Sequence, residues 1–215
     1  MRFSISDIIK IDIFMKKRVK LKYDKQKIFD AYLKFLKSNK KIILIEYKGK
    51  ELNSFYGITK DLEEVKIPLR FRISFLFKYN IQKYIIRLIN QLHGGEFKNK
   101  VYRLFGAKIG KEVRICEGAN IDESFLDLIK IGDGSIIGSD VKILAHEVTI
   151  KHLRFGRVNI GKQVVVGTNS IIRGGVSIGD GAVIAMDSLV NKDIPAREEW
   201  GGIPAHKIKK LRKLI

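Results

Sequence analysis

The chain has 215 residues, with one Cys, three Pro, and 42 Lys and Arg residues against 23 Asp and Glu residues, which gives a formal net charge of +19. This length is enough for two small domains. No apolar run approaches the roughly 20 residues of a membrane span. The charged N-terminal stretch does not resemble a signal peptide, and the single cysteine, Cys116, excludes an internal disulfide. We therefore expect a cytoplasmic protein.

Residues 1–65 are predicted to form a small α+β unit. The spacing of apolar residues predicts a helix and two strands, at 25–36, 42–45 and 55–59. This order of elements weakly resembles a single CBS motif, a ligand-binding module. Thr59 and Asp61 stand closer together than the closing Thr and Asp of that motif. An unrelated packing domain is the alternative.

Residues 66–108 are predicted to be helical and basic. Between 69 and 92, aromatic and aliphatic residues alternate with Lys and Arg, as in amphipathic helices. We expect this segment to cap the open end of the array that follows, with its aromatic residues, Tyr84 among them, buried on the first coil, and an interfacial helix on an anionic membrane is the alternative. Residues 1–108 hold 26 Lys and Arg against 10 Asp and Glu, whereas residues 109–215 hold 16 against 13. Nucleic acid is not an expected partner, because no nucleic-acid motif accompanies the charge.

The most regular feature of the chain is a period of six residues. Aliphatic residues recur at this step toward the C-terminus, at Ile160, Val166, Ile172, Ile178, Ile184 and Val190. Two earlier sets of three have the same step, at Ile109, Ile115 and Ile121 and at Ile131, Ile137 and Ile143. The period differs from that of a helix or a plain strand and is typical of a parallel β-helix. The predicted fold is therefore mainly β, with three units in each triangular coil and every eighteenth residue stacked on the next coil.

Two irregularities interrupt this array. The spacing from Ile121 to Ile131 is ten, which predicts a four-residue bulge at one corner. The spacing from Ile143 to Ile160 is seventeen, one short of a full coil, and the intervening segment is charged and contains two histidines. Because functional residues are commonly carried on loops of a rigid scaffold, this break is the predicted site of chemistry.

Residues 101–215 resemble the hexapeptide-repeat acyltransferases, nearest the maltose and galactoside O-acetyltransferases. The similarity runs through Tyr102–Gly110, through Ile178–Pro195 with its Asn-Lys-Asp-Ile-Pro element, and through Gly202–Ile208 with its Gly-x-Pro-Ala element. The resemblance implies a left-handed β-helix, an assembly into homotrimers, and acetyl-CoA bound between neighbouring subunits. After the units at 1–65 and 66–108, the expected domains are the β-helix at 109–195 and a C-terminal tail or helix at 196–215.

Acetyl transfer from a thioester to a hydroxyl needs a general base, a donor for the developing oxyanion and a groove for the CoA arm. The family carries its catalytic His at the break, so the resemblance implies that His146 is the base, with His152 as the alternative. It also assigns the oxyanion to the backbone N–H of Thr168. Glu147 is a candidate to orient the His146 ring.

The CoA site implied by the resemblance includes small corner residues, the Asn-Lys pair, the Pro-Ala element and nearby cations. These residues are Gly167, Thr168, Gly174, Ala185, Met186, Ser188, Asn191, Lys192, Pro204, Ala205, Lys207 and Lys209. Met186 and Ile203 depart from the family, which commonly has Ala and Asn there. The N-terminal acceptor motif of the maltose and galactoside enzymes is absent, so the acceptor stays open.

These features predict an acetyl-CoA-dependent O-acetyltransferase that modifies a hydroxyl of a sugar or a related small molecule, without a metal. An N-acetyltransferase acting on an amino sugar or amino acid is one alternative. A non-catalytic trimeric scaffold that presents the basic N-terminal domain is another. A β-helix carbonic anhydrase would need three His residues on one metal ion, and the break holds only two.

Overall fold

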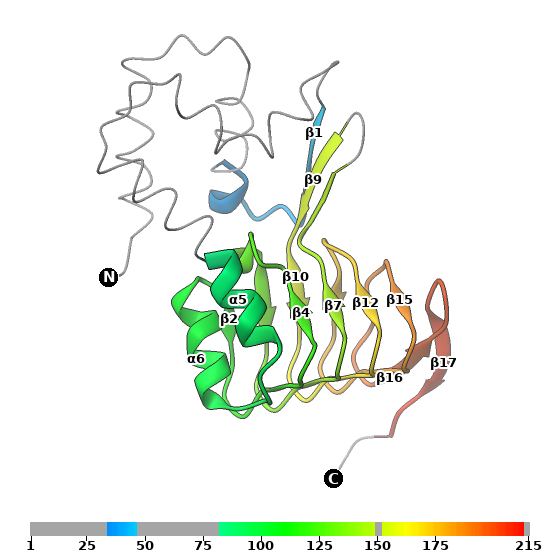
Figure 1. Ribbon diagram of the computed structural model, residues 1–215. Coiled ribbons are helices and arrows are strands. Elements are labelled where there is room, and N and C mark those ends of the chain that lie inside the picture. The colour runs from blue at the N-terminus through cyan, green and yellow to red at the C-terminus, as the bar shows by residue number, and fades with distance from the viewer. Residues whose placement is uncertain (1–33, 47–81, 149–151, 213–215) are drawn as a thin grey trace, which may run out of the picture.

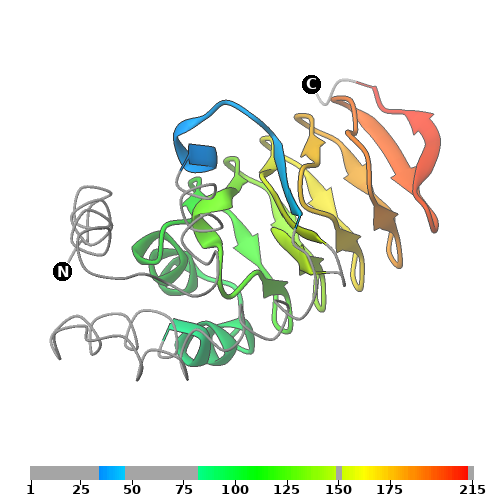
Figure 2. The same ribbon diagram turned by 90° about the horizontal axis from the view of Figure 1, so that it is seen from above.

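The structure is a computed structural model that describes residues 34–46, 82–148 and 152–212. Short strands wind into a triangular prism, with two helices at the end where the first coil begins (Figures 1 and 2). These helices are α5 (Gln82–Asn90) and α6 (Glu96–Leu104). The strand predicted at 42–45 is confirmed as β1 (Ile42–Glu46). Most of the predicted N-terminal α+β unit, including its strand at 55–59, lies outside the described residues.

Three parallel sheets form the sides of the prism, and we call them the first, second and third faces in chain order. The first face contains β2 (Lys108–Ile109), β5 (Ile129–Ile131), β10 (Val158–Ile160) and β13 (Ser177–Ile178). The second contains β3 (Arg114–Ile115), β6 (Ile136–Ile137), β11 (Val165–Val166) and β14 (Val183–Ile184). The third contains β4 (Asn120–Ile121), β7 (Lys142–Ile143), β12 (Ile171–Ile172) and β15 (Leu189–Val190). The described strands therefore complete four coils.

The aliphatic residues with the period of six form the core of the prism. Each strand pairs in parallel with its equivalent one coil away, so that Ile160 lies beside both Ile131 and Ile178. Burial of these side chains along one axis provides the hydrophobic stabilisation of the coil. The β-helix predicted from the repeat is confirmed, and so is the stacking of residues eighteen positions apart.

The break after Ile143 is an insertion and not a shortened coil. A regular array would reach the first face again six residues after Ile143, whereas Ile160 comes at seventeen. The eleven additional residues belong to a hairpin of β8 (His146–Val148) and β9 (His152–Gly156). Strand β1 pairs with β9 in antiparallel fashion and completes a three-stranded sheet. A segment from the N-terminal half therefore supports the hairpin (Figure 1).

The hairpin leaves the prism at a tight contact. A Cβ on Gly156 would lie 2.3 Å from the backbone nitrogen of Gly175, so only glycine fits without a shift. On the other side, the guanidinium of Arg157 donates to the carbonyls of Phe35 and Leu36 at 2.7 and 2.9 Å. It also lies 4.6 Å over the Phe35 ring. These contacts hold residues 34–46 against the base of the hairpin.

The C-terminal segment is a hairpin and not the helix considered from the sequence. Strand β16 (Glu198–Gly201) pairs in parallel with β14, and β17 (His206–Lys210) pairs with β16 in antiparallel fashion. The pairing of β16 satisfies the backbone edge that the last coil would otherwise expose, which explains why strands are preferred there. Trp200 lies beside Ile184 in this register.

Helices α5 and α6 pack against the first coil. Ile86 and Ile89 of α5 are buried, as is Tyr102 of α6. Tyr84, which we expected to be buried with the other aromatic residues of 69–92, is 65% exposed, and the aromatic residues before 82 lie outside the described part of the chain. The difference arises because α5 turns Ile86 and Ile89, not Tyr84, toward the coil.

Candidate functional site

His146 lies at the first residue of β8, where the chain leaves the third face. Its ring packs edge-on against Phe125, with the centroids 4.8 Å apart, and Phe125 packs in the same manner against Phe155 of β9. The His146 side chain is 24% exposed. The imidazole is thus held by aromatic contacts while part of it still reaches solvent. His152 lies in β9, but its side chain is outside the described part of the structure.

A buried carboxylate fixes the orientation of this ring. The Oδ2 atom of Asp122 lies 2.6 Å from Nδ1 of His146, and the Asp122 side chain is 1% exposed. Asp122 also accepts hydrogen bonds from the backbone N–H groups of Ala145, Ser124 and Phe125 at 2.8–3.1 Å. With Nδ1–H donated to the carboxylate, Nε2 is the atom that can accept a proton from a substrate.

Burial alone would raise the pKa of Asp122. The hydrogen bond and charge of His146, with the backbone N–H groups, outweigh burial and hold the pKa below its ordinary value. The carboxylate therefore stays ionised and can stabilise a positive charge on the imidazole. This combination of a buried acceptor and a partly exposed base is suited to general base catalysis.

Asp122 is not among the residues predicted from the sequence, although the sequence contains one signal for it. In several units the residue after the inward aliphatic is glycine, as at Gly110, Gly132, Gly161 and Gly179. Asp122 occupies this position after Ile121. A carboxylate in a slot that favours small residues marks a unit with an additional role.

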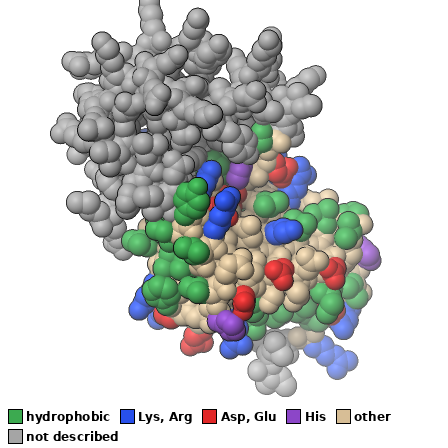
Figure 3. Space-filling view, in the orientation of Figure 1, with side chains coloured by type: hydrophobic (Ala, Val, Ile, Leu, Met, Phe, Trp, Pro, Cys, Tyr) green, Lys and Arg blue, Asp and Glu red, His purple; other side chains and the backbone are tan. Residues whose placement is uncertain are grey.

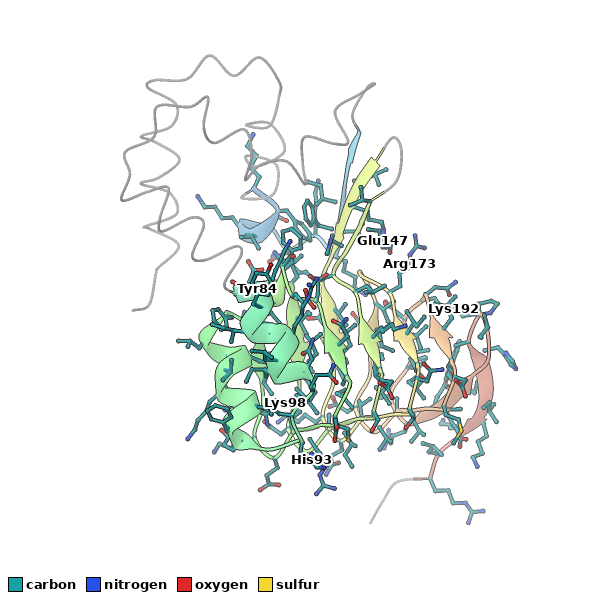
Figure 4. The ribbon with its side chains drawn as sticks, viewed as in Figure 1. Tyr84, His93, Lys98, Glu147, Arg173 and Lys192 are labelled. Carbon is teal, nitrogen blue, oxygen red and sulfur yellow. The ribbon has the colours of Figure 1, made fainter. Side chains whose placement is uncertain are left out.

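Glu147 does not hold the His146 ring, contrary to our expectation. Its Oε1 accepts from Arg154 and from Nε of Arg173, each at 2.7 Å, and its Oε2 accepts from Arg173 at 2.8 Å. The reason is that successive residues of a strand point to opposite faces. The hydrogen bond from Arg173 is the main cause of the lowered pKa of Glu147, which burial opposes. Figure 4 shows Glu147 and Arg173 beside one another next to the hairpin, so this pair ties the hairpin to the end of β12.

The predicted oxyanion donor, Thr168, lies at the corner between the second and third faces. A Cβ on Gly167 would come within 2.5 Å of the backbone nitrogen of Met186, so the two coils touch closely at this corner. Asn169 has a φ of 59°, which places it in the left-handed region. Thr168 and Asn169 are therefore the two central residues of a turn with the left-handed residue second, as in a type II turn. Met186 is 69% exposed beside them.

A single chain does not bring His146 and Thr168 together. Ile143 and Ile172 pair across β7 and β12 of the third face. His146 comes three residues after Ile143, and Thr168 comes four residues before Ile172. Without the turn residues Thr168 and Asn169, about five residues at about 3.3 Å each separate the two groups by on the order of 15 Å along the strand direction. The base and the oxyanion donor thus lie at opposite edges of the third face.

Two of the small residues predicted to bind CoA are internal. Ser188 is 2% exposed, and its hydroxyl donates to the carbonyl of Ala185 at 2.7 Å. Gly174 is buried, and a Cβ there would lie 3.0 Å from the carbonyl oxygen of Leu144, at the base of the hairpin. The Ser188 side chain therefore serves the coil, and Gly174 lies at a different corner from Ala185.

The remaining predicted CoA residues lie at the C-terminal end of the prism. Lys207 pairs with Glu198 at 2.6 Å, and Lys209 pairs with Glu199 at 3.2 Å. Asn191 and Pro204 are exposed, whereas Ala205 is buried. The Nζ atom of Lys192 lies 4.9 Å over the Trp200 ring. The two paired lysines are partly neutralised by glutamates, so CoA phosphates would have to compete for them.

Among the described residues, neither a cavity nor a metal-binding cluster adds to this site. A cavity of about 590 Å³ opens on the first face, lined by residues that include Asn159, Ser177 and Asp193, but none of the predicted site residues lines it. Within 34–46, 82–148 and 152–212, no group of three His, Cys, Asp or Glu side chains is placed to hold a metal ion. The chemistry of the site therefore centres on Asp122 and His146.

No protein-family model matches the chain. The YvoF protein of Bacillus subtilis (strain 168), which carries an acetyltransferase name, is 43% identical over 108 residues, or 50% of the chain and 63% of that protein. The galactoside O-acetyltransferase of Escherichia coli (strain K12) is 31% identical over 102 residues, or 43% of the chain and 50% of that protein. The chain therefore spans less than two thirds of the length of these relatives.

The coil is also present in a solved structure. The hexapeptide-repeat-containing acetyltransferase VCA0836 of Vibrio cholerae superposes with a TM-score of 0.51 at 20% identity, over 63% of the chain and 92% of that structure. At this identity the likeness concerns the fold, which is a left-handed parallel β-helix. The chain is thus similar in sequence to proteins named as acetyltransferases and in fold to a hexapeptide-repeat-containing acetyltransferase.

Proposed function

We propose that this protein is an acetyl-CoA-dependent O-acetyltransferase whose acceptor is a hydroxyl of a sugar or a related small molecule. The observation that carries the proposal is the Asp122–His146 pair at the break in the coil. A partly exposed imidazole that a buried carboxylate orients is a general base ready to accept a proton at Nε2. The similarity to acetyltransferases supplies the class of reaction.

The proposed reaction begins when the acceptor hydroxyl attacks the carbonyl carbon of the acetyl thioester. Nε2 of His146 takes the hydroxyl proton as the new C–O bond forms, and the Asp122 carboxylate stabilises the imidazolium. The backbone N–H of Thr168 donates to the oxyanion of the tetrahedral intermediate. When the intermediate collapses, the C–S bond breaks and the CoA thiolate takes the proton from the imidazolium. Ester and CoA thiol are the products, and both residues return to their starting states.

We propose further that the active form is a homotrimer. His146 and Thr168 lie at opposite edges of the third face, so one chain cannot place both beside the same thioester. A closed ring of three copies would let His146 of one subunit face Thr168 of the next. Ile171 and Leu189 point outward from the third face and are half-buried, which gives this face apolar surface to pack against a neighbour.

The assignment of a hydroxyl of a sugar rests on the similarity to a protein named galactoside O-acetyltransferase. The N-terminal acceptor motif of that branch is absent here, and β1 joins the hairpin beside His146 instead. The three-stranded sheet is therefore the surface of this chain that distinguishes its acceptor. An amine acceptor would need the same base, so the identity of the acetylated atom must be measured.

The test is thioester cleavage with acetyl-CoA against a panel of sugars, amino sugars and amino acids. His146→Ala should lower the rate about 10²–10⁴-fold, while the affinity for CoA measured by calorimetry stays the same. His152→Ala is the matched control and should cost much less. Release of the product acetyl group by alkaline hydroxylamine would identify an ester, whereas resistance would identify an amide. If the protein binds CoA but cleaves acetyl-CoA with none of the acceptors, the result would favour the non-catalytic scaffold.

A further inference from the structure

Helix α6 turns two polar residues, Lys98 and Asn99, toward the coil together with Tyr102, while two large apolar residues, Phe97 and Leu104, face outward. Its buried residues are Lys98, Asn99 and Tyr102, each 1% exposed or less. Phe97 and Leu104 on the opposite side are 66% and 65% exposed. A helix on the surface of a protein normally turns its apolar stripe toward the core. The burial of Lys98 and Asn99 while Phe97 and Leu104 stay exposed therefore calls for a physical reason.

Specific hydrogen bonds fix this orientation. The ammonium group of Lys98 donates to the carbonyls of Asn90, Leu92 and Cys116 at 3.1, 2.9 and 2.8 Å. Asn99 donates to the carbonyl of Val113 at 2.7 Å, and the Tyr102 hydroxyl donates to the Asn90 side chain at 2.6 Å. Rotating α6 to bury its apolar side would leave these buried groups without partners, at a large cost. The apolar side of α6 is thus held outward.

Helix α5 extends the same apolar surface. Tyr84 and Leu88 lie four residues apart on one side of α5 and are 65% and 71% exposed, and Leu92 just beyond the helix is 44% exposed. We call the following set the outer helical face: Tyr84, Leu88, Leu92, Phe97 and Leu104. Hydrophobic side chains gather over α5 and α6 in the space-filling view (Figure 3). A cluster of large apolar side chains this exposed indicates a surface that contacts a partner.

The surrounding charge selects the kind of partner. Residues 82–111 contain seven Lys and Arg residues and one acidic residue, Glu96; with Lys98 buried, six cations and one carboxylate remain outside, a net of +5. Arg87, Lys100 and Lys108 are exposed around the outer helical face. Packing a second copy of the chain on this face would bring two strongly basic surfaces together. An anionic lipid surface is complementary in both respects, since its headgroups attract the cations and its acyl region accepts the apolar side chains.

We propose that the outer helical face binds the surface of anionic membranes, with Phe97, Leu104, Tyr84 and Leu88 inserted and the flanking Lys and Arg side chains at the headgroups. No helix among the described residues has the length and apolar character needed to cross a bilayer, so α5 and α6 would lie in the plane of the interface. This inference rests on the helices alone and does not depend on the acetyl-transfer reaction.

Vesicle flotation with the full chain tests the proposal. Wild type should bind phosphatidylcholine vesicles that contain phosphatidylglycerol and should not bind vesicles of phosphatidylcholine alone. The double variant Phe97→Ser/Leu104→Ser should lose affinity for the anionic vesicles by about tenfold or more, because two inserted side chains are removed. The matched control is Ile136→Ser/Val165→Ser, which removes two aliphatic side chains exposed on the second face and should leave binding unchanged.

A thermal melt of each variant shows whether the coil is still folded, and Tyr84→Ser/Leu88→Ser provides an independent pair on α5 if the first pair unfolds. Equal binding of the helix variants and wild type would overturn the proposal, because the attraction would then come from charge elsewhere. Equal binding of wild type to neutral and anionic vesicles would also contradict it. A change in oligomeric state in the helix variants would assign the face to a second copy of the chain instead.

Discussion

The carboxylate of Asp122 meets the imidazole of His146 at 2.6 Å although the two residues are 24 positions apart on successive coils. The pair exists because β4 stacks on β7, which places the residues that follow these strands next to each other. The lowered pKa of Asp122 shows that the folded state favours the ionised form of this carboxylate. This stabilisation is present above the unfolded pKa of about 4 and is lost as the pH falls through the lower, folded value.

Asp122→Asn should therefore reduce kcat by about 10²-fold or more while the KM for acetyl-CoA changes little. The amide keeps the size of the side chain but cannot fix the Nδ1–H tautomer or stabilise the imidazolium. Nitrogen NMR of His146 should show the Nδ1–H tautomer in wild type and a mixture in the variant. Glu123→Gln, which removes the neighbouring carboxylate that pairs with Arg87, is the control and should keep both the rate and the tautomer.

The period of six was sufficient to predict the coil, because an aliphatic residue at every sixth position can be buried on one axis only in that fold. Asp122 was not predicted, since its importance depends on a partner in the next coil. The break was located correctly, but its structure as a hairpin was not predicted, because a spacing of seventeen does not tell a shortened coil from an inserted hairpin. The pairing of β1 with β9 joins residues more than a hundred positions apart, which no local pattern reports.

The oxyanion donor can be removed without disturbing its turn. Thr168 precedes the left-handed Asn169, and proline is favoured at this position of a type II turn. Thr168→Pro deletes the backbone N–H and should lower kcat by about 10²–10³-fold. Ser139→Pro is the control, since Ser139 likewise precedes a left-handed residue, Asp140, at the equivalent corner one coil earlier. Comparable activity in Thr168→Pro and wild type would assign the oxyanion to a different donor.

Mixed trimers test whether one site is shared between two subunits. Chains with His146→Ala and chains with Thr168→Pro should each be inactive alone. When the two are coexpressed with different tags and the mixed species is purified, a site that combines the intact His146 of one chain with the intact Thr168 of the other should recover activity. We expect roughly one third of the wild-type rate, because a closed ring of three with both kinds of chain contains one such interface.

Failure to recover activity in verified mixed trimers would mean that both groups come from the same chain. Sedimentation of the wild type at micromolar concentration gives the independent check of the assembly. A monomer that is fully active would contradict the trimeric site, whatever the result of the mixing experiment.

Lys98 gives the last prediction, which concerns stability. Burial lowers its pKa from 10.5 to about 8. Between these values the unfolded chain binds more protons than the folded chain, so the contribution of Lys98 to stability rises with pH in this range. The difference in unfolding free energy between wild type and Lys98→Met should therefore increase by about 2–3 kcal/mol from about pH 7 to about pH 10.

Urea unfolding of both proteins at the two pH values measures this difference. The variant has no titratable group at this position, so the change of the difference with pH reports the titration of the Lys98 ammonium group and of the hydrogen bonds that depend on it. Burial also raises the pKa of Tyr102, so the unfolded state gains stability above about pH 10 as its tyrosine ionises, but this effect is common to both proteins and cancels. If the difference in unfolding free energy did not change with pH, the pKa of Lys98 would be the same in the folded and unfolded chains. The three carbonyls would then compensate fully for the burial of its charge.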